Sequence, residues 1–303
     1  MSSPTLTIAS VTGHQGYAQG SVYAIETSFQ ELQGRIPHIK CLLISPERPD
    51  VLPDHIQHIP CQPFSYFEYN LFMIYGLGQL IETDFCLVVQ HDGWVINGNN
   101  WRDEFFEYDY IGAPLPDLAE IRDNQFIRHF NPDVWLAHKD NAPEYFYEWQ
   151  NGGFSLRSRK LLNAPRELGL TIEVAACNPF QSHPLTLQWD FSQQHIQHVE
   201  DLYFSAIKRS LLEQHGMKFA PRHLAAYFSV EFVPIQQLEN IPLNAVLGAH
   251  FTSRCTLIGI KKVQINAIVY SLEDLTNNIF LRTLAETHHT FEIPPECNKI
   301  EPV

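Results

Sequence analysis

The stretch Cys86–Trp94, CLVVQHDGW, combines a short aliphatic run with a polar turn. The aliphatic run predicts a buried strand, and Gln90, His91 and Asp92 follow where that strand ends. In open α/β sheets, ligands bind just beyond the carboxyl ends of the strands. A carboxylate at this position can hold a metal ion on a diphosphate, but an Asp-Gly pair also commonly forms a simple turn. This stretch alone leaves both interpretations open.

The segments around this stretch alternate between strand and helix patterns. Strands are predicted at residues 5–12, 39–45 and 85–90, where apolar and β-branched residues form short runs. Helices are predicted at residues 22–32 and 69–81, where apolar residues recur at helical spacing. This alternation is typical of a sheet with crossover helices, so we expect an α/β fold.

The second half of the chain adds longer irregular stretches. A short strand is predicted at residues 108–113, a strand followed by a helix at residues 154–162, and an amphipathic helix at residues 199–212. Residues 115–148 and 172–196 contain several Pro residues and are predicted to be loops. A loop as long as 115–148 within a compact domain is usually a lid or a substrate surface.

Size and charge limit the classes of function. The chain has 303 residues, 45% of them hydrophobic, so it can bury a sizeable core. We expect one domain at residues 1–255 and a C-terminal extension, residues 256–303, packed on that same domain. The net charge of −14 argues against non-specific binding to nucleic acid, which needs a surface rich in Lys and Arg.

Cysteine usage and hydropathy bear on the compartment. The six Cys residues are scattered without C-x-x-C spacing, which argues against a disulfide framework or a zinc cluster. The first residues lack the basic and apolar regions of a signal peptide, and no apolar run is long enough to span a bilayer. The sequence therefore predicts a cytoplasmic protein without a transmembrane segment.

A turn with three glycines, residues 12–20 (TGHQGYAQG), follows the first predicted strand. It occupies the position of a dinucleotide fingerprint, but its spacing does not match G-x-G-x-x-G. The second strand ends in Ser45-Pro46-Glu47 without a clean ribose-binding acid at its tip. A nicotinamide site is therefore not favoured, whereas a turn that passes close to another nucleotide remains plausible.

A further polar segment is Asn151-Gly152-Gly153-Phe154. Paired glycines allow a ligand or another backbone to approach closely, and the Asn151 amide suits sugar hydroxyls. Arg157 and Arg159 follow and could approach phosphates. A tight turn before a helix, with the arginines solvated, explains the same segment.

Two more signals lie near the end of the second half. Glu200 and Asp201 begin a predicted helix, where acids either favour the helix dipole or serve in acid–base chemistry. His250, in Leu247–His250 (LGAH), is a candidate ligand, although a lone His is more often structural.

These segments occur together and in a fixed order: VVQHDGWV, WRDEFFEYDYIGAP, NGGFSLRSRKLL, VEDLYFS, GMKFAPRHLAAYFSVE and LGAH. In that order they resemble the bacterial and fungal family DUF5672 over roughly residues 5–252. That family resembles GT-A-type glycosyltransferases, and the NGGF and Glu-Asp segments also resemble those of galactosyltransferase-like enzymes. The resemblance implies a single α/β domain with a GT-A-like, Rossmann-type mixed sheet flanked by helices.

The resemblance also implies roles for individual residues. Asp92 matches the last position of a D-x-D metal motif, and His250 matches a late metal-binding His, so these two hold Mn²⁺ or Mg²⁺. Asp201, or Glu200 as the second choice, matches the base of an inverting reaction. The residues implied in donor or acceptor binding are Thr12, Asn70, Gln90, His91, Asn151, Gly152, Gly153 and Phe154.

The implied activity is that of a hexosyltransferase-type glycosyltransferase. It would move a sugar from a nucleotide-sugar donor such as a UDP-sugar to a glycan or glycolipid acceptor, as in polysaccharide biosynthesis. A binding protein with little or no turnover is an alternative, because only the last position of Gln90-His91-Asp92 is acidic. A metal-dependent phosphoesterase fits less well, because the sequence lacks a clustered His/Asp motif for a two-metal site.

Overall fold

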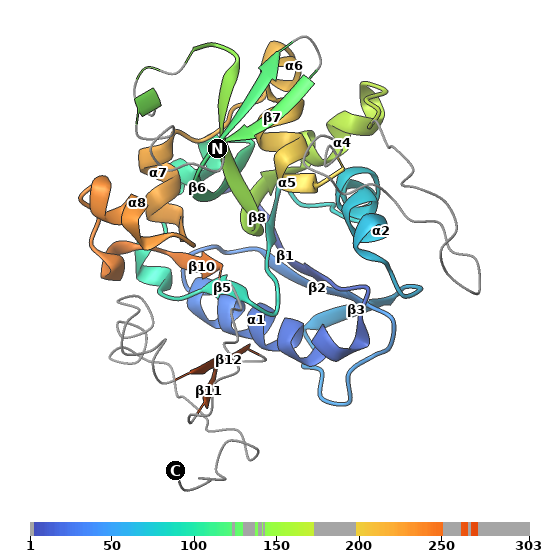
Figure 1. Cartoon of the computed structure of the whole chain (residues 1–303). Coiled ribbons are helices and arrows are strands. Elements are labelled where there is room, and N and C mark those ends of the chain that lie inside the picture. Colours follow the sequence, from blue (N-terminus) through green and yellow to red (C-terminus); the bar gives the residue numbers. More distant parts are fainter. Residues whose placement is uncertain are drawn as a thin grey trace, which may run out of the picture.

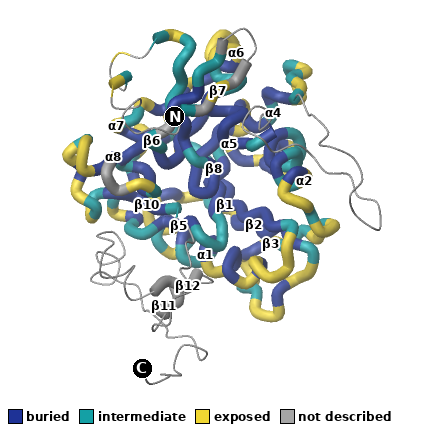
Figure 2. The backbone as a smooth tube through the Cα atoms, in the orientation of Figure 1, coloured by how far each residue is buried: buried dark blue, intermediate teal, exposed yellow. Residues whose placement is uncertain are grey.

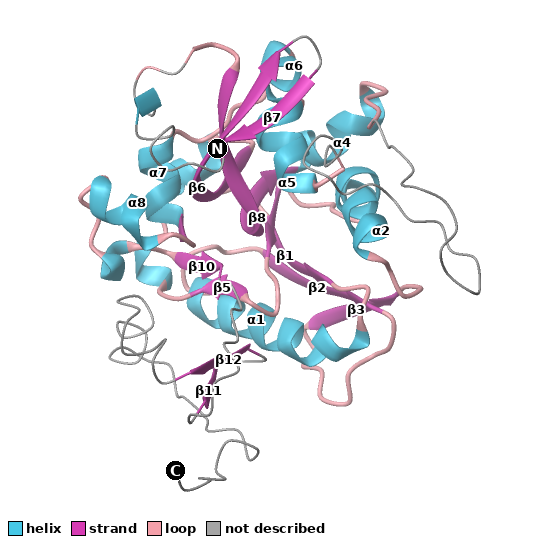
Figure 3. Cartoon of the chain, viewed as in Figure 1, coloured by secondary structure: helices cyan, strands magenta, loops and turns pink. Residues whose placement is uncertain are grey.

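The computed structural model describes residues 3–122, 125–129, 137–138, 141, 143–172, 198–250, 262–265 and 268–271 (Figure 1). Strands occupy the middle of the molecule and helices surround them (Figure 3). None of the helices in these residues has the length and apolar character needed to cross a bilayer.

The central sheet has seven strands in the order β3-β2-β1-β4-β8-β6-β7. The first four run parallel, while β8, β6 and β7 join antiparallel to their neighbours. The expected mixed α/β sheet flanked by helices in a single domain is therefore confirmed. The strand bounds are β1 Leu6–Val11, β2 Ile39–Ser45, β3 Ile56–Pro60, β4 Phe85–Val88, β6 Tyr110–Arg122, β7 Gln125–His129 and β8 Phe146–Ser158.

A smaller sheet of three strands, in the order β5-β10-β9, lies beside the central one (Figure 1). It consists of β5 Gly93–Val95, β10 Gly248–His250 and β9 Ser229–Val230. A separate hairpin pairs β11 Lys262–Ile265 with β12 Ile268–Ser271. The predicted boundary at residue 255 lies outside the described residues.

The helices cover both faces of the central sheet. The longest, α1, spans Ala18–Leu32, and a capping box between Ser65 and Glu68 begins α2. The remaining helices are α2 Tyr66–Leu71, α4 Arg159–Glu167, α5 Glu200–Leu202, α6 Arg209–Gln214, α7 Arg222–Phe228 and α8 Val233–Leu238. Short 3₁₀ turns lie at Gln15–Tyr17, Leu77–Gln79, Gly98–Asn100, Asp103–Glu107 and Leu243–Ala245, and π-helical turns at Phe72–Gly76 and Tyr203–Ile207.

The inner parallel strands β1 and β4 and most of β2 are buried on both faces, as Figure 2 shows by their dark colour, whereas β3 at the edge is partly exposed. Along β1, Leu6 and Ile8 point into a core shared with α1, while Ala9 and Val11 point into a second core. The second core is closed by Met73, from the helical turn after α2. Burial on both faces explains why these strands read as continuous apolar runs rather than as alternating ones.

The strands predicted at residues 39–45 and 85–90 are confirmed, whereas β3 was not predicted. The two long helices predicted at residues 69–81 and 199–212 are broken into short α, π and 3₁₀ pieces. The apolar spacing in both segments fits a helix, but it does not reveal where the hydrogen-bond register changes.

The loop predicted at residues 115–148 is wrong for a large part of its length. β6 continues to Arg122 and pairs with both β7 and β8, burying Leu118 and Ala119 completely. The Pro and Asp residues indicated a loop, but pairing with strands distant in sequence outweighs these local preferences. The other predicted loop, at residues 172–196, lies outside the described residues except for residue 172.

Candidate functional site

The strand order of the central sheet reverses between β1 and β4. Ligands of open α/β sheets bind at such a switch point, outside the carboxyl ends of the strands. Thr12 is the first residue after β1, and Gln90 is the second residue after β4. Two residues that were predicted to take part in donor or acceptor binding therefore lie at the ends of the two strands that flank the switch point.

Asp92 lies at the tip of a tight turn after β4. Gln90 and Gly93 exchange two backbone hydrogen bonds, both 3.0 Å long, which leaves His91 and Asp92 as the central residues of the turn. The start of the turn is fixed by Gln90, whose Nε2 donates to the Tyr69 hydroxyl at 2.6 Å.

The smaller sheet brings His250 to this turn. His250 in β10 pairs with Gly93 in β5, directly after Asp92. The His250 Nε2 lies 3.5 Å from the Asp92 Oδ1, and its Nδ1 lies 3.3 Å from the Glu231 Oε2. On the other side, the His91 Nδ1 lies 3.6 Å from the same Asp92 oxygen.

The pKa values of these groups follow from this packing. Burial alone would raise the pKa of Asp92, but the neighbouring His250 and His91 hold it below its usual value. Burial would lower the pKa of His250, but the carboxylates of Glu231 and Asp92 raise it well above 6.5. Burial also lowers the pKa of His91, against the pull of Asp92.

We tested whether these residues suit a divalent cation. Among the described residues, no three His, Cys, Asp or Glu side chains are arranged as ready ligands of one ion. Asp92 and His250 together provide two: a buried Asp92 Oδ1 that makes no hydrogen bond to the described residues, and an imidazole nitrogen facing it. These two residues could hold a divalent cation such as Mg²⁺, which usually keeps several waters and needs few protein ligands.

Glu200 and Asp201 lie in the first turn of α5, and both are buried. The Glu200 backbone N–H donates to the Asn70 Oδ1 at 2.9 Å, so Asn70 holds the start of α5. The Glu200 carboxylate pairs with the fully buried Arg157 at 2.7 Å. Arg157 is therefore occupied by Glu200 inside the protein and is not available on the surface for phosphates.

Asp201 lacks such a cation. One of its oxygens accepts from the Leu202 N–H at 2.6 Å and the other from the Gly152 N–H at 3.2 Å. Burial and the nearby Glu200 carboxylate raise the pKa of Asp201 to about 7. A carboxylate with a pKa near neutrality is a suitable general base at physiological pH.

The Gly152–Gly153 pair lies between the Glu200–Asp201 pair and His250. A Cβ atom on Gly152 would lie 2.2 Å from the Glu200 Oε1, and one on Gly153 would lie 2.3 Å from the His250 Nε2. The pairing of β8 with β6 jumps here, from Gly112–Ser155 to Ala113–Asn151. Residues 152–154 thus form a bulge in β8 that brings the backbone against Glu200 and Asp201 on one side and His250 on the other.

The remaining predicted site residues differ in their placement. The Asn151 side chain accepts from the Gly153 N–H at 2.6 Å and so shapes the bulge. The ring of Phe154 is completely buried and stacks on Phe228, which makes it part of the core. Arg159 donates to the Glu82 carbonyl, at the opposite end of β4 from Asp92.

The turn after β1 places an aromatic side chain next to Asp92. The Tyr17 ring stacks on His91, with ring centroids 4.2 Å apart, and is 46% exposed. The Thr12 hydroxyl donates to the His14 carbonyl and holds this turn. Sequence reasoning missed Tyr17, Glu231 and the buried pairing of Arg157. For Glu231 a signal was available, because it directly follows a strand, as Asp92 nearly does.

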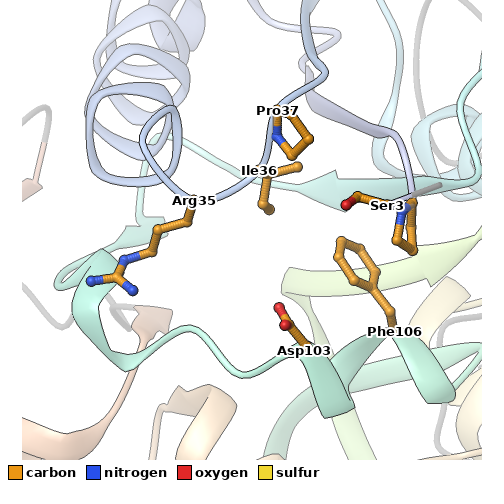
Figure 4. Close-up of a pocket in the computed structure, with 7 residues that line it drawn as sticks. Ser3, Arg35, Ile36, Pro37, Asp103 and Phe106 are labelled. Atoms are coloured by element: carbon orange, nitrogen blue, oxygen red, sulfur yellow. The ribbon is translucent and has the colours of Figure 1, made fainter. Parts of the chain in front are cut away.

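A cavity of about 200 Å³ lies elsewhere, between Ser3, the Ile36-Pro37 loop and Phe106 (Figure 4). Ser3 precedes β1 and Ile36 precedes β2, so this cavity is at the amino ends of the strands. It is therefore on the opposite edge of the sheet from Asp92.

Comparison with known families agrees with the order of motifs. Residues 59–250 match the family described as "Protein of unknown function (DUF5672)". The chain belongs to this family. The matched region includes β4, the NGGF bulge of β8, α5 and His250, so the DUF5672 match spans nearly all of the candidate site.

Other comparisons add little. No curated protein matches the chain. A solved structure of a mannose-1-phosphate geranyltransferase from Thermus thermophilus is similar at 13% sequence identity and a TM-score of 0.30. That match covers 56% of this chain and 64% of the other, so this chain spans less than two thirds of its length. A likeness at this level leaves the activity open.

Proposed function

We propose that this DUF5672 protein is a GT-A-like glycosyltransferase that moves a sugar from a nucleotide-sugar donor, such as a UDP-sugar, to a hydroxyl of a glycan or glycolipid. Asp92 and His250 would hold Mn²⁺ or Mg²⁺ at the donor diphosphate. Asp201 would be the base of an inverting reaction. Thr12 and Gln90 would lie near the nucleotide, at the switch point of the sheet.

One observation carries this proposal. Consecutive glycines of one bulge contact the two halves of the site, because the Gly152 N–H donates to the Asp201 Oδ2 at 3.2 Å and Gly153 packs against His250. The proposed base and the proposed cation-binding pair would thus lie on either side of one strand. Sugar transfer needs this combination, since a base must act near the bond to the leaving diphosphate.

The chemistry assigns each group one task. The acceptor oxygen forms a bond to the anomeric carbon while the bond from that carbon to the diphosphate breaks. Asp201, ionised above a pH of about 7, takes the acceptor proton. A bound divalent cation neutralises the charge of the departing diphosphate. Glu200 cannot easily serve as the base because it is paired with Arg157.

The experiment is a thermal-shift screen of nucleoside diphosphates and nucleotide sugars with Mn²⁺, followed by a hydrolysis assay of any donor that binds. A ligand at 100 times its Kd should stabilise the fold by about 2.7 kcal/mol. Mn²⁺-dependent hydrolysis or transfer would support the enzyme. Donor binding without turnover would favour the binding protein, and no shift with any nucleotide would refute the proposal.

A further inference from the structure

Glu231 lies beside His250 because of the register of the smaller sheet. β9 and β10 pair in parallel, with Ser229 opposite Gly248 and Val230 opposite Ala249. Glu231 is the next residue after β9, so it lies level with His250. The sheet therefore places Asp92, His250 and Glu231 in a row, one from each strand or its adjoining turn.

The two carboxylates lie at different nitrogens of the His250 ring. Glu231 is at Nδ1, 3.3 Å away, and Asp92 is at Nε2, 3.5 Å away. All three side chains are at most 14% exposed. Among the described residues, neither the Glu231 Oε2 nor the His250 Nδ1 makes a geometrically complete hydrogen bond. Contacts of this kind are often long in a ligand-free site and shorten when the ligand binds.

We propose that Glu231 is the positioning residue of His250. Its carboxylate accepts the proton on Nδ1, which fixes the orientation of the ring and leaves Nε2, the nitrogen that faces Asp92, as the one that would bind a cation. A cation ligated by histidine usually has such a carboxylate behind the ring, and the carboxylate strengthens the ligand. The inference rests on the cation site of the proposed function, and Glu231 itself, behind the ring, is not a ligand.

A second carboxylate–histidine pair in the chain provides a control. The His129 Nε2 lies 2.9 Å from the Glu120 Oε2 on the β6–β7 hairpin. The pair lies on β6 and β7, and in the central sheet β8 separates β6 from β4, the strand before the Asp92 turn. Glu120→Gln therefore makes the same chemical change as Glu231→Gln without altering the contact between Glu231 and His250.

The test measures Mn²⁺ binding to the full chain with no nucleotide present. The concentration of free Mn²⁺ is measured by electron paramagnetic resonance for wild type, Glu231→Gln, Glu231→Ala and Glu120→Gln. Loss of the outer carboxylate should weaken Mn²⁺ binding by about 10- to 100-fold in Glu231→Ala, less in Glu231→Gln, and not in Glu120→Gln. Circular dichroism confirms that each variant is folded.

A second readout separates positioning from a purely structural role. Pulsed electron paramagnetic resonance of bound Mn²⁺ should detect hyperfine coupling to an imidazole nitrogen in wild type. His250→Ala is the reference that lacks this imidazole. The coupling should diminish in Glu231→Ala and persist in Glu120→Gln. Unchanged affinity and coupling in Glu231→Ala would overturn the inference, and so would a wild type that binds no Mn²⁺ or shows no nitrogen coupling.

Failure of this inference and failure of the proposed function can be told apart. Donor turnover that needs no metal would reject the role of Glu231 and leave the transferase intact. Mn²⁺ binding that depends on Glu231, in a protein that binds no nucleotide sugar, would support the role of Glu231 and reject the transferase.

Discussion

Glu200 and Asp201 are neighbours in the chain, yet their surroundings give them different properties. Glu200 is neutralised by Arg157, a buried cation whose pKa burial would lower but the Glu200 carboxylate raises. Asp201 accepts hydrogen bonds from the backbone N–H groups of Gly152 and Leu202, and its pKa rises to about 7. A buried charge without a partner is costly, whereas a paired one is tolerated.

Asp201→Asn should lower kcat by about 100-fold or more with little change in donor affinity, since base catalysis acts in the transition state. In wild type, kcat should rise with pH through about 7, because only the ionised carboxylate accepts a proton. Pre-steady-state or steady-state rates across a pH range of about 5 to 9 check both points. A pH-independent kcat in wild type would remove Asp201 from the reaction.

Folding stability provides a test of the same carboxyl that needs no substrate. Because the pKa of Asp201 rises from 3.8 to about 7 on folding, its contribution to stability is present below pH 3.8 and lost as the pH rises through 7. Asp201→Asn stays neutral, so its Tm relative to wild type should be higher at a pH of about 8 than at about 5. Effects that do not depend on pH cancel in this comparison.

Glu200→Gln should behave differently from its neighbour. It leaves the Arg157 charge buried without its partner, which should lower the free energy of unfolding by about 3–5 kcal/mol. Urea denaturation at neutral pH measures this loss. Wild-type stability in the variant would mean that the pair contributes little.

Asp92→Asn should leave the fold intact and weaken Mn²⁺ binding, because it replaces the charged oxygen that faces His250 with a neutral amide. Mn²⁺-dependent turnover should fall with it. Equilibrium binding of Mn²⁺ and the Mn²⁺ dependence of the rate are the measurements. Unchanged values for both would show that Asp92 does not bind a metal ion and that the turn has only a structural role.

At the scale of the element, the bulge in β8 connects both halves of the site. Gly153→Ala places a methyl group 2.3 Å from the His250 Nε2, so the ring must move and Mn²⁺ binding should weaken. Gly34→Ala is the matched control, because no atom lies within 4 Å of its added Cβ. Equal Mn²⁺ affinity in the two variants would contradict the packing of His250 against the bulge.

The elements that sequence reasoning predicted well are those that local pattern determines. β2 is a continuous apolar run because both of its faces are covered, and its predicted bounds at residues 39–45 match the structure. The extension of β6 to Arg122 could not be predicted in this way. It depends on pairing with β8, which lies much further along the chain, and Pro114 hides the signal.

At the scale of the whole molecule, negative charge dominates. The chain carries a net charge of −14, and the candidate site collects the carboxylates of Asp92, Asp201 and Glu231. A diphosphate would be repelled from this surface unless a cation lies between them. UDP should therefore bind more than about tenfold more weakly in EDTA than with Mn²⁺, a difference of about 1.4 kcal/mol.

Isothermal titration of UDP with EDTA, Mn²⁺ or Mg²⁺ measures this difference. Restoring Mn²⁺ after EDTA treatment is the control for irreversible damage. Equal affinity in EDTA would mean that another part of the protein supplies the positive charge.

The whole molecule also explains which site residues sequence reasoning could find. Asp92 and His250 carry recognisable motifs, and the smaller sheet brings them together although they lie far apart in the chain. Glu231 has only its position after a strand as a signal, and the importance of both Glu231 and Arg157 lies in the side chain that each one contacts. A single sequence shows the residue types but not these partners.

The bulge in β8 has a consequence for laboratory evolution of this protein. A single-residue deletion among residues 152–154 would shift one half of the β8 pairing against the other and turn every side chain of that half to the opposite face. Libraries that vary the length of this segment should therefore return mostly unfolded protein. Libraries that vary His14 and Tyr17, in a turn outside the sheet, leave the strand pairing untouched and change the side chains beside His91.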